Sequence, residues 1–415
     1  MKNLTIDPGR LWDDLMQTAK IGATAKGGIC RLTLTDLDRE VRDWFKTRAQ
    51  ALGCTVTIDD MGTMFARRKG QRDDIAPIAM GSHLDTQPTG GKFDGALGVH
   101  AALEALTALQ RAGYETFAPI EVINWTNEEG SRFSPAMIAS GVFAGAFTRD
   151  FAHARKDRDG ESFGSALEKI GYRGSEPSGG HKLSAFFELH IEQGPYLEAE
   201  AKDIGVVTGV QAMRWYEVTV TGQESHAGTT PMPRRHDALL GAARLIDFVN
   251  DCARTFPEAV GTVGRVEVRP GSPNVIPGEV FFTLDLRDPD STVIDGMEKE
   301  FAAATKRIGD ALGLAIALKP VSNVPAVHFD KDCIAAVRAA AKASGFSSRD
   351  IVSRAGHDAS YISRVTPTAM IFVPCKDGIS HNEAEFSSKE QCAAGAQVLL
   401  QAVLDYDRQL AERES

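Results

Sequence analysis

Short apolar runs alternate with amphipathic segments over the first half of the chain. Ile75–Met80, Pro119–Trp125 and Ser184–Ile191 have the continuous apolar character of buried strands. Ala96–Gln110 lies between the first two and has the apolar spacing of a helix. This strand–helix–strand order predicts a largely parallel sheet with helices on both faces, which is an α/β fold.

The rhythm changes near Met213. The patterns then follow the order β-α-β-β-α-β, which is typical of a ferredoxin-like α+β unit, over Trp215–Thr221, Asp237–Phe256, Gly261–Val268, Val275–Leu286, Thr292–Leu312 and Leu314–Val321. From about His328 the helix–strand alternation returns. We therefore expect one α/β domain, residues 1–212 and 328–415, interrupted by an inserted domain of residues 213–327.

Length, composition and charge narrow the class of protein. A chain of 415 residues is too long for one ordinary core, which agrees with two domains. Its 43% hydrophobic and 25% charged residues are typical of a soluble globular protein. The net charge of -10, without a Lys/Arg cluster, argues against nucleic acid as a partner. The chain lacks a membrane-length apolar run and an N-terminal signal core, so we expect no membrane association and a cytoplasmic location.

The cysteines indicate which ligands a metal would have. Six are scattered without Cys-x-x-Cys pairs, at Cys30, Cys54, Cys252, Cys333, Cys375 and Cys392. This spacing is typical of reduced thiols and not of a disulfide framework or a thiolate metal site. Any metal must therefore be held by histidine and carboxylate.

Polar, ionisable residues follow four probable strands of the α/β domain. His83 follows the first, Asn127-Glu128-Glu129-Gly130 the second, His190 ends the third, and His381 follows a fourth strand at Thr368–Pro374. Asp94, in the turn-rich FDG segment, precedes the Ala96–Gln110 helix. Ligands of open α/β sheets bind at the carboxyl ends of strands. Each residue alone fits a solvated loop or a structural histidine, but their convergence predicts a metal site.

The number of candidate ligands favours two metal ions. His83, His190, His381, Asp94 and Glu129 are five ligands, and catalytic zinc usually takes three from the protein. If Asp94 bridges the two ions, His83 and His190 complete the ligands of one ion, and Glu129 and His381 complete those of the other. Two divalent ions would lower the pKa of a water shared between them. Zinc is the first expectation, with manganese, cobalt and nickel as alternatives.

Glu128 remains as a candidate general base. Adjacent residues in extended structure point apart, so one glutamate can bind metal while Glu128 faces the water. The alternative is a surface acid. We expect Asp85 to orient His83 from behind and to raise the basicity of its ring.

Several motifs resemble the hydantoinase/carbamoylase family of dinuclear-metal amidohydrolases. They are GSHLDTQPTGGKFDG, NWTNEEGSRFSPAMIASGVFAG, ELHIEQGP, ESHAGTTPM, SPNVIPG and AGHDAS, which span nearly the whole chain. That family includes N-carbamoyl-L-amino-acid hydrolases, β-ureidopropionases and allantoate amidohydrolases. The resemblance implies a zinc-peptidase-like catalytic domain with mostly parallel sheet, and an inserted lid and dimerisation domain.

The resemblance also implies roles for residues outside the metal set. His226 and Asn274 would polarise the substrate carbonyl, and Arg287 would bind the substrate carboxylate. Gln193 and the turn at Gly356-His357 would line the ureido end; these last three lie outside the inserted domain. For His226 the alternative is an ordinary loop histidine. For Arg287 it is a surface ion pair with Asp285 or Asp288.

We therefore expect a hydrolase of N-carbamoyl (ureido) amino acids that acts on N-carbamoyl-β-alanine or N-carbamoyl-L-amino acids and forms a homodimer through the inserted domain. The products would be an amino acid, carbon dioxide and ammonia. The alternatives are an allantoate amidohydrolase, an aminoacylase or exopeptidase of the same clan, and a non-catalytic binding protein on the same fold.

Overall fold

The computed structural model describes residues 4–414, and the chain divides into two compact units. Unit 1 contains Met1–Gly209 and His328–Ser415, and unit 2 contains Val210–Val327. Within the described residues, no helix is long and apolar enough to cross a membrane.

The larger sheet supplies the framework of unit 1. Its strand order is β1-β2-β4-β3-β5-β16-β6-β14, with β15 paired to β6. The strands are β1 (Thr55–Ile58), β2 (Met64–Arg68), β3 (Ile78–His83), β4 (Ile120–Trp125), β5 (Ala185–Ile191), β6 (Ile204–Val210), β14 (Val327–His328), β15 (Ser348–Ser353) and β16 (Thr368–Val373). β3 is parallel to β4 and β5, and β5 is parallel to β16. The carboxyl ends of these four strands therefore meet at one edge of the sheet, and the predicted α/β class is confirmed.

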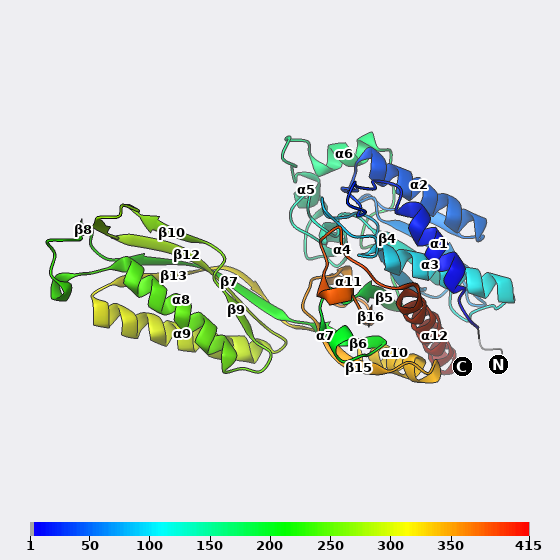
Figure 1. Ribbon diagram of the computed structural model, residues 1–415. Coiled ribbons are helices and arrows are strands. Elements are labelled where there is room, and N and C mark those ends of the chain that lie inside the picture. Colours follow the sequence, from blue (N-terminus) through cyan, green and yellow to red (C-terminus); the bar gives the residue numbers. More distant parts are fainter. Residues whose placement is uncertain (1–3, 415) are drawn as a thin grey trace. The chain divides into compact units, whose positions relative to one another are not determined.

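Helices cover both faces of this sheet (Figure 1). Gly395 of α12 packs against the Leu189 side chain of β5, and α3 packs on α12. The N–H of Ala359 in α11 donates instead to Glu188, the preceding residue of β5. Successive strand residues point to opposite faces, so α12 and α11 lie on opposite sides. The helical segments are α1 (Pro8–Thr18), α2 (Asp36–Ala51), α3 (Ala96–Ala112), α4 (Ile138–Phe143), α5 (Arg149–His153), α6 (Phe163–Lys169), α7 (Tyr196–Ala199), α10 (Lys331–Ala343), α11 (Asp358–Ile362), η2 (Lys376–Gly378) and α12 (Lys389–Glu414).

Unit 2 has the predicted ferredoxin-like arrangement. Its antiparallel sheet has the order β10-β12-β7-β13, with β9 paired to β12, and β8 and β11 form a separate two-stranded sheet. The two segments expected as single strands, Gly261–Val268 and Val275–Leu286, are each divided in two. In the second, Pro277-Gly278 separates β11 from β12, because proline has no N–H to donate to a ladder. The elements are β7 (Ala212–Thr221), β8 (Ser225–His226), η1 (Met232–Arg234), α8 (Ala238–Arg254), β9 (Val260–Thr262), β10 (Val266–Arg269), β11 (Val275–Ile276), β12 (Glu279–Asp288), α9 (Ser291–Leu312) and β13 (Ala315–Val324).

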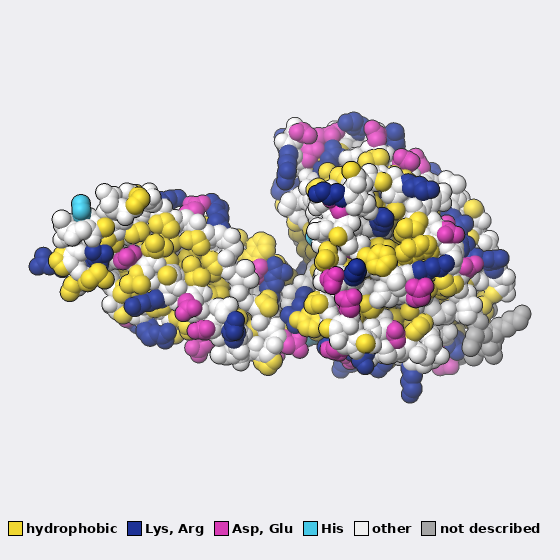
Figure 2. Space-filling view, in the orientation of Figure 1, with side chains coloured by type: hydrophobic (Ala, Val, Ile, Leu, Met, Phe, Trp, Pro, Cys, Tyr) yellow, Lys and Arg dark blue, Asp and Glu magenta, His cyan; other side chains and the backbone are white. Residues whose placement is uncertain are grey.

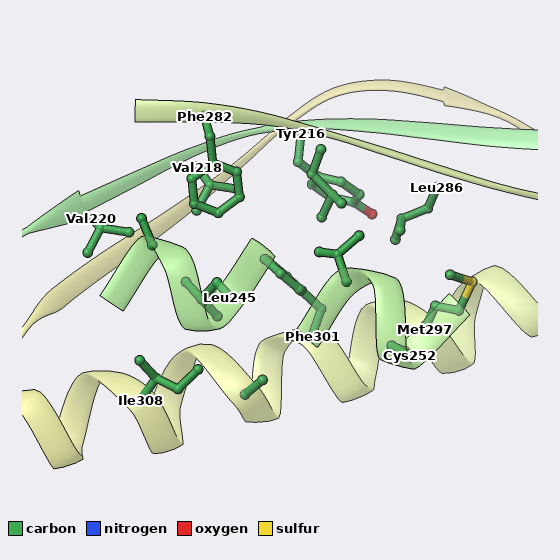
Figure 3. Packing of buried hydrophobic residues seen from close by; sticks show 14 of the residues in the cluster. Tyr216, Val218, Val220, Leu245, Cys252, Phe282, Leu286, Met297, Phe301 and Ile308 are labelled. Atoms are coloured by element: carbon green, nitrogen blue, oxygen red, sulfur yellow. The ribbon is translucent and has the colours of Figure 1, made fainter. Parts of the chain in front are cut away.

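Unit 2 has its own hydrophobic core between the sheet and its two long helices. Every second residue of β12 is buried, as expected for a strand with one covered face. Phe282 of β12 and Val218 of β7 face Leu245 of α8, and Phe301 of α9 completes the layer (Figure 3). The sheet and its core thus fix the positions of β7 and β12, and with them the position of Arg287 near the end of β12.

Candidate metal centre and active site

The predicted metal ligands come together at the carboxyl edge of the parallel strands in unit 1. His83 ends β3, His190 is the second-to-last residue of β5, and His381 follows β16 in a loop. Asp94 precedes α3, and Glu129 follows β4. Among the described residues, two groups of side chains place one ligand atom each within 4.8 Å of the others: His83, Asp94 and His190, and Asp94, Glu129 and His381.

The two carboxylate oxygens of Asp94 point to different groups. Oδ1 lies 3.1 Å from His190 Nε2 and 3.6 Å from His83 Nε2. Oδ2 lies 3.4 Å from His381 Nε2, which is itself 3.5 Å from Glu129 Oε2. A carboxylate in this orientation can be shared by two cations.

The hydrogen bonds of the two buried histidines fit a metal site. His83 Nδ1 lies 2.9 Å from the carbonyl oxygen of Asp85, and His190 Nδ1 lies 2.9 Å from that of Ile191. A carbonyl oxygen only accepts, so each Nδ1 carries a hydrogen, and in the neutral ring that binds a metal each Nε2 presents a lone pair. These lone pairs face the oxygens of Asp94 in a buried pocket, and His83 Nε2 has no hydrogen-bond partner. A cation between them removes this repulsion, so the donor set fits a divalent metal.

The pKa values show the same demand for positive charge. Burial lowers the pKa of His83, but the carboxylates of Glu128, Asp94 and Asp85 outweigh burial and raise this pKa well above its ordinary value. Burial raises the pKa of Asp94, but the neighbouring rings of His190 and His83 bring it well below the ordinary range.

Gly95 explains why glycine follows Asp94 at the start of α3. Its φ of 64° lies in the left-handed region, which glycine adopts without strain. A Cβ at this position would also lie 2.2 Å from His83 Cε1. The Asp94 turn therefore packs its backbone directly against the His83 ring.

The Glu128–Glu129 pair lies in a turn, not in the extended segment that we expected. Asn127 and Gly130, on either side, have φ values of 60° and 64°. The two side chains nevertheless diverge. Glu129 Oε2 faces His381, whereas Glu128 Oε2 lies 3.5 Å from His83 Nε2.

The electrostatic surroundings of Glu128 suit a proton acceptor. Its side chain is almost fully buried. Burial, together with the charges of Asp358, Glu129 and Asp94, raises the pKa of Glu128 well above its ordinary value, although His83 opposes the shift. When it is ionised, a carboxylate with a raised pKa is a stronger proton acceptor than an ordinary glutamate.

Asp85 contacts both His83 and the glutamate turn. Its backbone carbonyl accepts the hydrogen bond from His83, while its carboxylate Oδ1 is 3.9 Å from His83 Nδ1. The two carboxylate oxygens instead accept from the N–H groups of Glu128 and Glu129, each at 3.3 Å. Asp85 therefore holds the glutamate turn against β3.

A cavity of about 160 Å³ opens beside the ligands. Gln193, Gly356 and His357 line it, as do Met137 and Glu128. Gln193 Nε2 donates to Asp94 Oδ2 at 2.9 Å. His357 is buried, and burial together with the neighbouring His190 holds its pKa well below the ordinary value, so its ring is neutral.

The other predicted residues lie in unit 2. His226 in β8 is paired with Val275 of β11, so it lies beside Asn274. His226 is exposed, and its Nδ1 accepts from the N–H of Gly228 at 3.0 Å. Arg287 lies near the end of β12 and pairs with Asp285, with Nη2 at 2.8 Å from Oδ2. This ion pair is the alternative that the sequence left open for Arg287.

Three side chains that support the ligands were not singled out from the sequence. Gln87 donates to Glu129 through its backbone N–H and its Nε2, and Glu385 and Ser380 contact Asp94. Gln87 lies inside the quoted QPTGGKFDG motif, and Glu385 lies four residues after His381. The positions of these residues relative to the metal ligands follow no motif, because a residue that supports a ligand can come from any neighbouring loop.

The parallel α/β sheet and the two overlapping ligand groups beside a buried glutamate define a metal-dependent hydrolase. The profile of peptidase family M20/M25/M40 matches residues 79–405. An N-carbamoyl-L-amino-acid amidohydrolase of Rhizobium meliloti is 50% identical over 97% of both chains. An allantoate amidohydrolase of Bacillus subtilis is 35% identical over 92% of this chain and 93% of the relative. A solved amidase of the hydantoinase/carbamoylase family from Burkholderia multivorans has a TM-score of 0.93 at 56% identity, over 97% of this chain and 98% of that one.

The chain thus belongs to the hydantoinase/carbamoylase family of amidohydrolases, within peptidase family M20/M25/M40. This finding confirms the family that the motifs indicated.

Proposed function

We propose that this protein hydrolyses N-carbamoyl-L-amino acids with the help of two divalent metal ions. Zinc is the metal that we expect, and its ligands would be His83, Asp94, Glu129, His190 and His381. The observation that carries the proposal is Asp94, whose two oxygens face separate ligand groups beside Glu128. The name of the Rhizobium meliloti relative supports the substrate class.

Divalent ions at this position would polarise the ureido carbonyl and acidify a water molecule. In the proposed reaction, Glu128 accepts a proton of that water as the water oxygen forms a bond to the ureido carbon, and it delivers the proton to the nitrogen of the amino acid as the C–N bond breaks. The carbamate that leaves decomposes to carbon dioxide and ammonia. Gln193 and the Gly356-His357 turn line the cavity where the ureido group would bind.

Unit 2 would complete the site. His226 and Asn274 would donate hydrogen bonds to the carbonyl oxygen as it gains negative charge. The planar guanidinium group of Arg287 would bind the substrate carboxylate through two hydrogen bonds. Arg287 would then have to give up its ion pair with Asp285.

These unit 2 residues are too far apart to serve one substrate molecule from one subunit. Arg287 lies eight positions along β12 from Glu279, the residue beside the β8–β11 sheet, which is about 27 Å of strand. β8 and β9, the strand that pairs with Arg287, also lie at opposite ends of unit 2 (Figure 1). We therefore propose a homodimer in which the His226 end of unit 2 serves the partner's site.

The surface of unit 2 supports such an interface. Figure 2 shows hydrophobic side chains gathered on one face of this unit. Most of the exposed large hydrophobic residues in the described part of the chain belong to unit 2, although it is the smaller one: Trp215, Met232, Leu239, Leu240, Val260, Val266, Val321 and Val324. Exposed apolar surface of this kind is typical of a protein interface.

A substrate panel tests the function. Metal-loaded protein is given N-carbamoyl-L-amino acids, N-carbamoyl-β-alanine, allantoate, N-acetyl amino acids and dipeptides, and ammonia and free amino groups are measured. We expect the highest kcat/KM for an N-carbamoyl-L-amino acid, with ammonia release. A preference for allantoate would favour the activity named for the Bacillus subtilis relative, and cleavage of acetyl substrates or dipeptides an aminoacylase or exopeptidase. Inactivity on every substrate, together with retained metal binding, would favour a binding protein.

A further inference from the structure

A buried glutamate behind the metal centre has no part in the mechanism described so far. Glu385 is only 4% exposed, and its segment follows the loop that carries His381. Its Oε1 accepts from the backbone N–H groups of Phe93 and Asp94, at 3.1 and 3.0 Å. Its Oε2 accepts from Ser380 Oγ at 2.8 Å.

The same contacts reach the side chain of Asp94. Ser380 Oγ lies 3.1 Å from Asp94 Oδ2, the oxygen that faces His381. Glu385 therefore holds the backbone N–H of Asp94 directly, and the hydroxyl group of Ser380 lies within hydrogen-bond distance of both carboxylates.

The local packing keeps Glu385 in this position. The backbone of Gly91 lies so close that a Cβ there would be 2.1 Å from Glu385 Oε1. The N–H of Lys376 donates to the carbonyl of Phe386 at 2.9 Å, which closes the loop that presents Ser380 and His381. The carboxylate is thus clamped between the Asp94 turn and the His381 loop.

We propose that Glu385 is a positioning residue that sets the metal affinity of both ligand groups by fixing Asp94. It does not line the cavity beside the ligands, so it acts through Asp94 and not on the substrate. Because Asp94 belongs to both groups, a displaced Asp94 weakens both. This inference deepens the proposed function and rests on its dinuclear centre.

Gln87 provides the contrast that makes the proposal specific. Its backbone N–H and Nε2 donate to the two oxygens of Glu129, at 3.1 and 2.6 Å. Glu129 belongs to one ligand group only. Loss of the Gln87 side chain should therefore weaken one metal position and leave the other unchanged.

The experiment measures metal binding and not activity. Metal-free protein is titrated with Zn²⁺ against a chromophoric chelator, the ions bound per chain are counted by elemental analysis, and the Co²⁺ absorption spectrum is recorded. Glu385→Ala should weaken both positions by about 10- to 100-fold. Gln87→Ala should weaken one. Glu383→Ala is the matched control, because it removes a carboxylate of the same loop. Among the charged groups of the described chain, Glu383 pairs only with Lys26, so this variant should bind both metal ions as tightly as the wild type does.

A conservative variant separates positioning from loss of fold. Glu385→Gln retains an oxygen that can accept from both N–H groups, so it should recover most of the affinity that Glu385→Ala loses. If Glu385→Ala does not fold, Ser380→Ala carries the test, with a smaller loss at both positions. Unchanged affinity in the folded variants, or a loss at one position only, would overturn the proposal.

The wild type distinguishes this failure from failure of the proposed centre. If wild-type protein binds a single ion, the dinuclear proposal is wrong. Glu385→Ala must still weaken that ion, because Asp94 is common to both groups.

Discussion

At the scale of the residue, the site depends on carboxylates with unequal tasks. Asp94 presents one oxygen to each ligand group, Glu129 faces His381, and Glu128 remains beside His83. Asp85 and Glu385 accept backbone N–H groups and hold the other three in place. So many buried carboxylates are tolerable only with compensating positive charge, which is the strongest physical reason for divalent ions here.

Glu128→Gln tests the division of these tasks. Glutamine keeps the shape but cannot accept the proton of the water, so we expect metal binding to persist while kcat falls by at least about 100-fold. Metal content and steady-state kinetics, measured on the same preparation, check this outcome. Retained turnover would remove Glu128 from its proposed role.

At the scale of the element, α3 is the part whose fit to the sheet is closest. Its N-terminus follows Asp94 directly, so the position of the helix fixes the position of the shared ligand. Gly98 permits this approach, because a Cβ there would lie 2.4 Å from the carbonyl oxygen of Leu189 in β5.

Gly98→Ala should therefore push α3 away from the sheet. We expect a loss of about 1–3 kcal/mol in the free energy of unfolding, together with weaker metal binding. Gly296→Ala in α9 is a matched control, because a Cβ there meets only Phe256 Cζ at 3.7 Å. That variant should gain up to about 1 kcal/mol from helix propensity. Urea unfolding measures both, and equal behaviour of the two variants would contradict the packing argument.

A second element-scale contact makes stability depend on pH. The ring of His181 stacks on Phe65 of β2, and its Nε2 pairs with the buried Glu121 of β4. Burial lowers the pKa of His181, but the hydrogen bond and charge of Glu121 outweigh burial, and the pKa is raised. The stabilisation is therefore complete below the ordinary histidine pKa of about 6.5 and is lost as pH rises through the raised value.

The expected result is a pH-dependent difference between the wild type and His181→Gln. The wild type should be more stable near pH 6, by no more than about 1 kcal/mol because the pair is partly exposed, and the difference should shrink toward pH 9. Unfolding in urea at several pH values measures it. A difference that does not change with pH would show that the ion pair contributes nothing.

The elements also show what the amino-acid pattern can and cannot predict. β3, β4 and β5 are buried over their whole length because both faces are covered, and their largely apolar sequences predict such strands without a structure. The turn around Glu128 was wrongly expected to be extended, since its conformation depends on Asp85 in another loop. The supporting roles of Gln87 and Glu385 cannot be predicted from the sequence for the same reason. Their partners are distant in the sequence, and the contacts involve backbone atoms as well as side chains.

At the scale of the whole molecule, the separation of His226 from Arg287 within unit 2 is the feature with the widest consequence. About 27 Å of β12 lies between the two ends, and no side chain spans that distance. The two ends must therefore serve different molecules of substrate if both take part in catalysis.

Mixing two inactive variants tests this arrangement. Glu128→Gln inactivates its own unit 1, and His226→Ala inactivates the site that its unit 2 serves. If that site is the partner's, a mixed dimer has one intact site of two, and half of the dimers are mixed. Re-association of equal amounts should then restore about a quarter of wild-type activity. No recovery, with mixed dimers confirmed by mass spectrometry, would place His226 and Glu128 in the same subunit's site.

The scatter of the five ligands along the chain constrains the order of events during synthesis. His83, Asp94 and His190 have left the ribosome long before β16 exists, yet β16 is the strand that must settle beside β5. His381 emerges later still, after all of unit 2. A nascent chain can therefore gather His83, Asp94 and His190 before unit 2 is made, whereas the second group, for which Asp94 and Glu129 are already present, is complete only once His381 has been synthesised. Completion of the second group is in that sense a step that follows the synthesis of unit 2, and a shortened chain that stops before His381 would lack one member of that group.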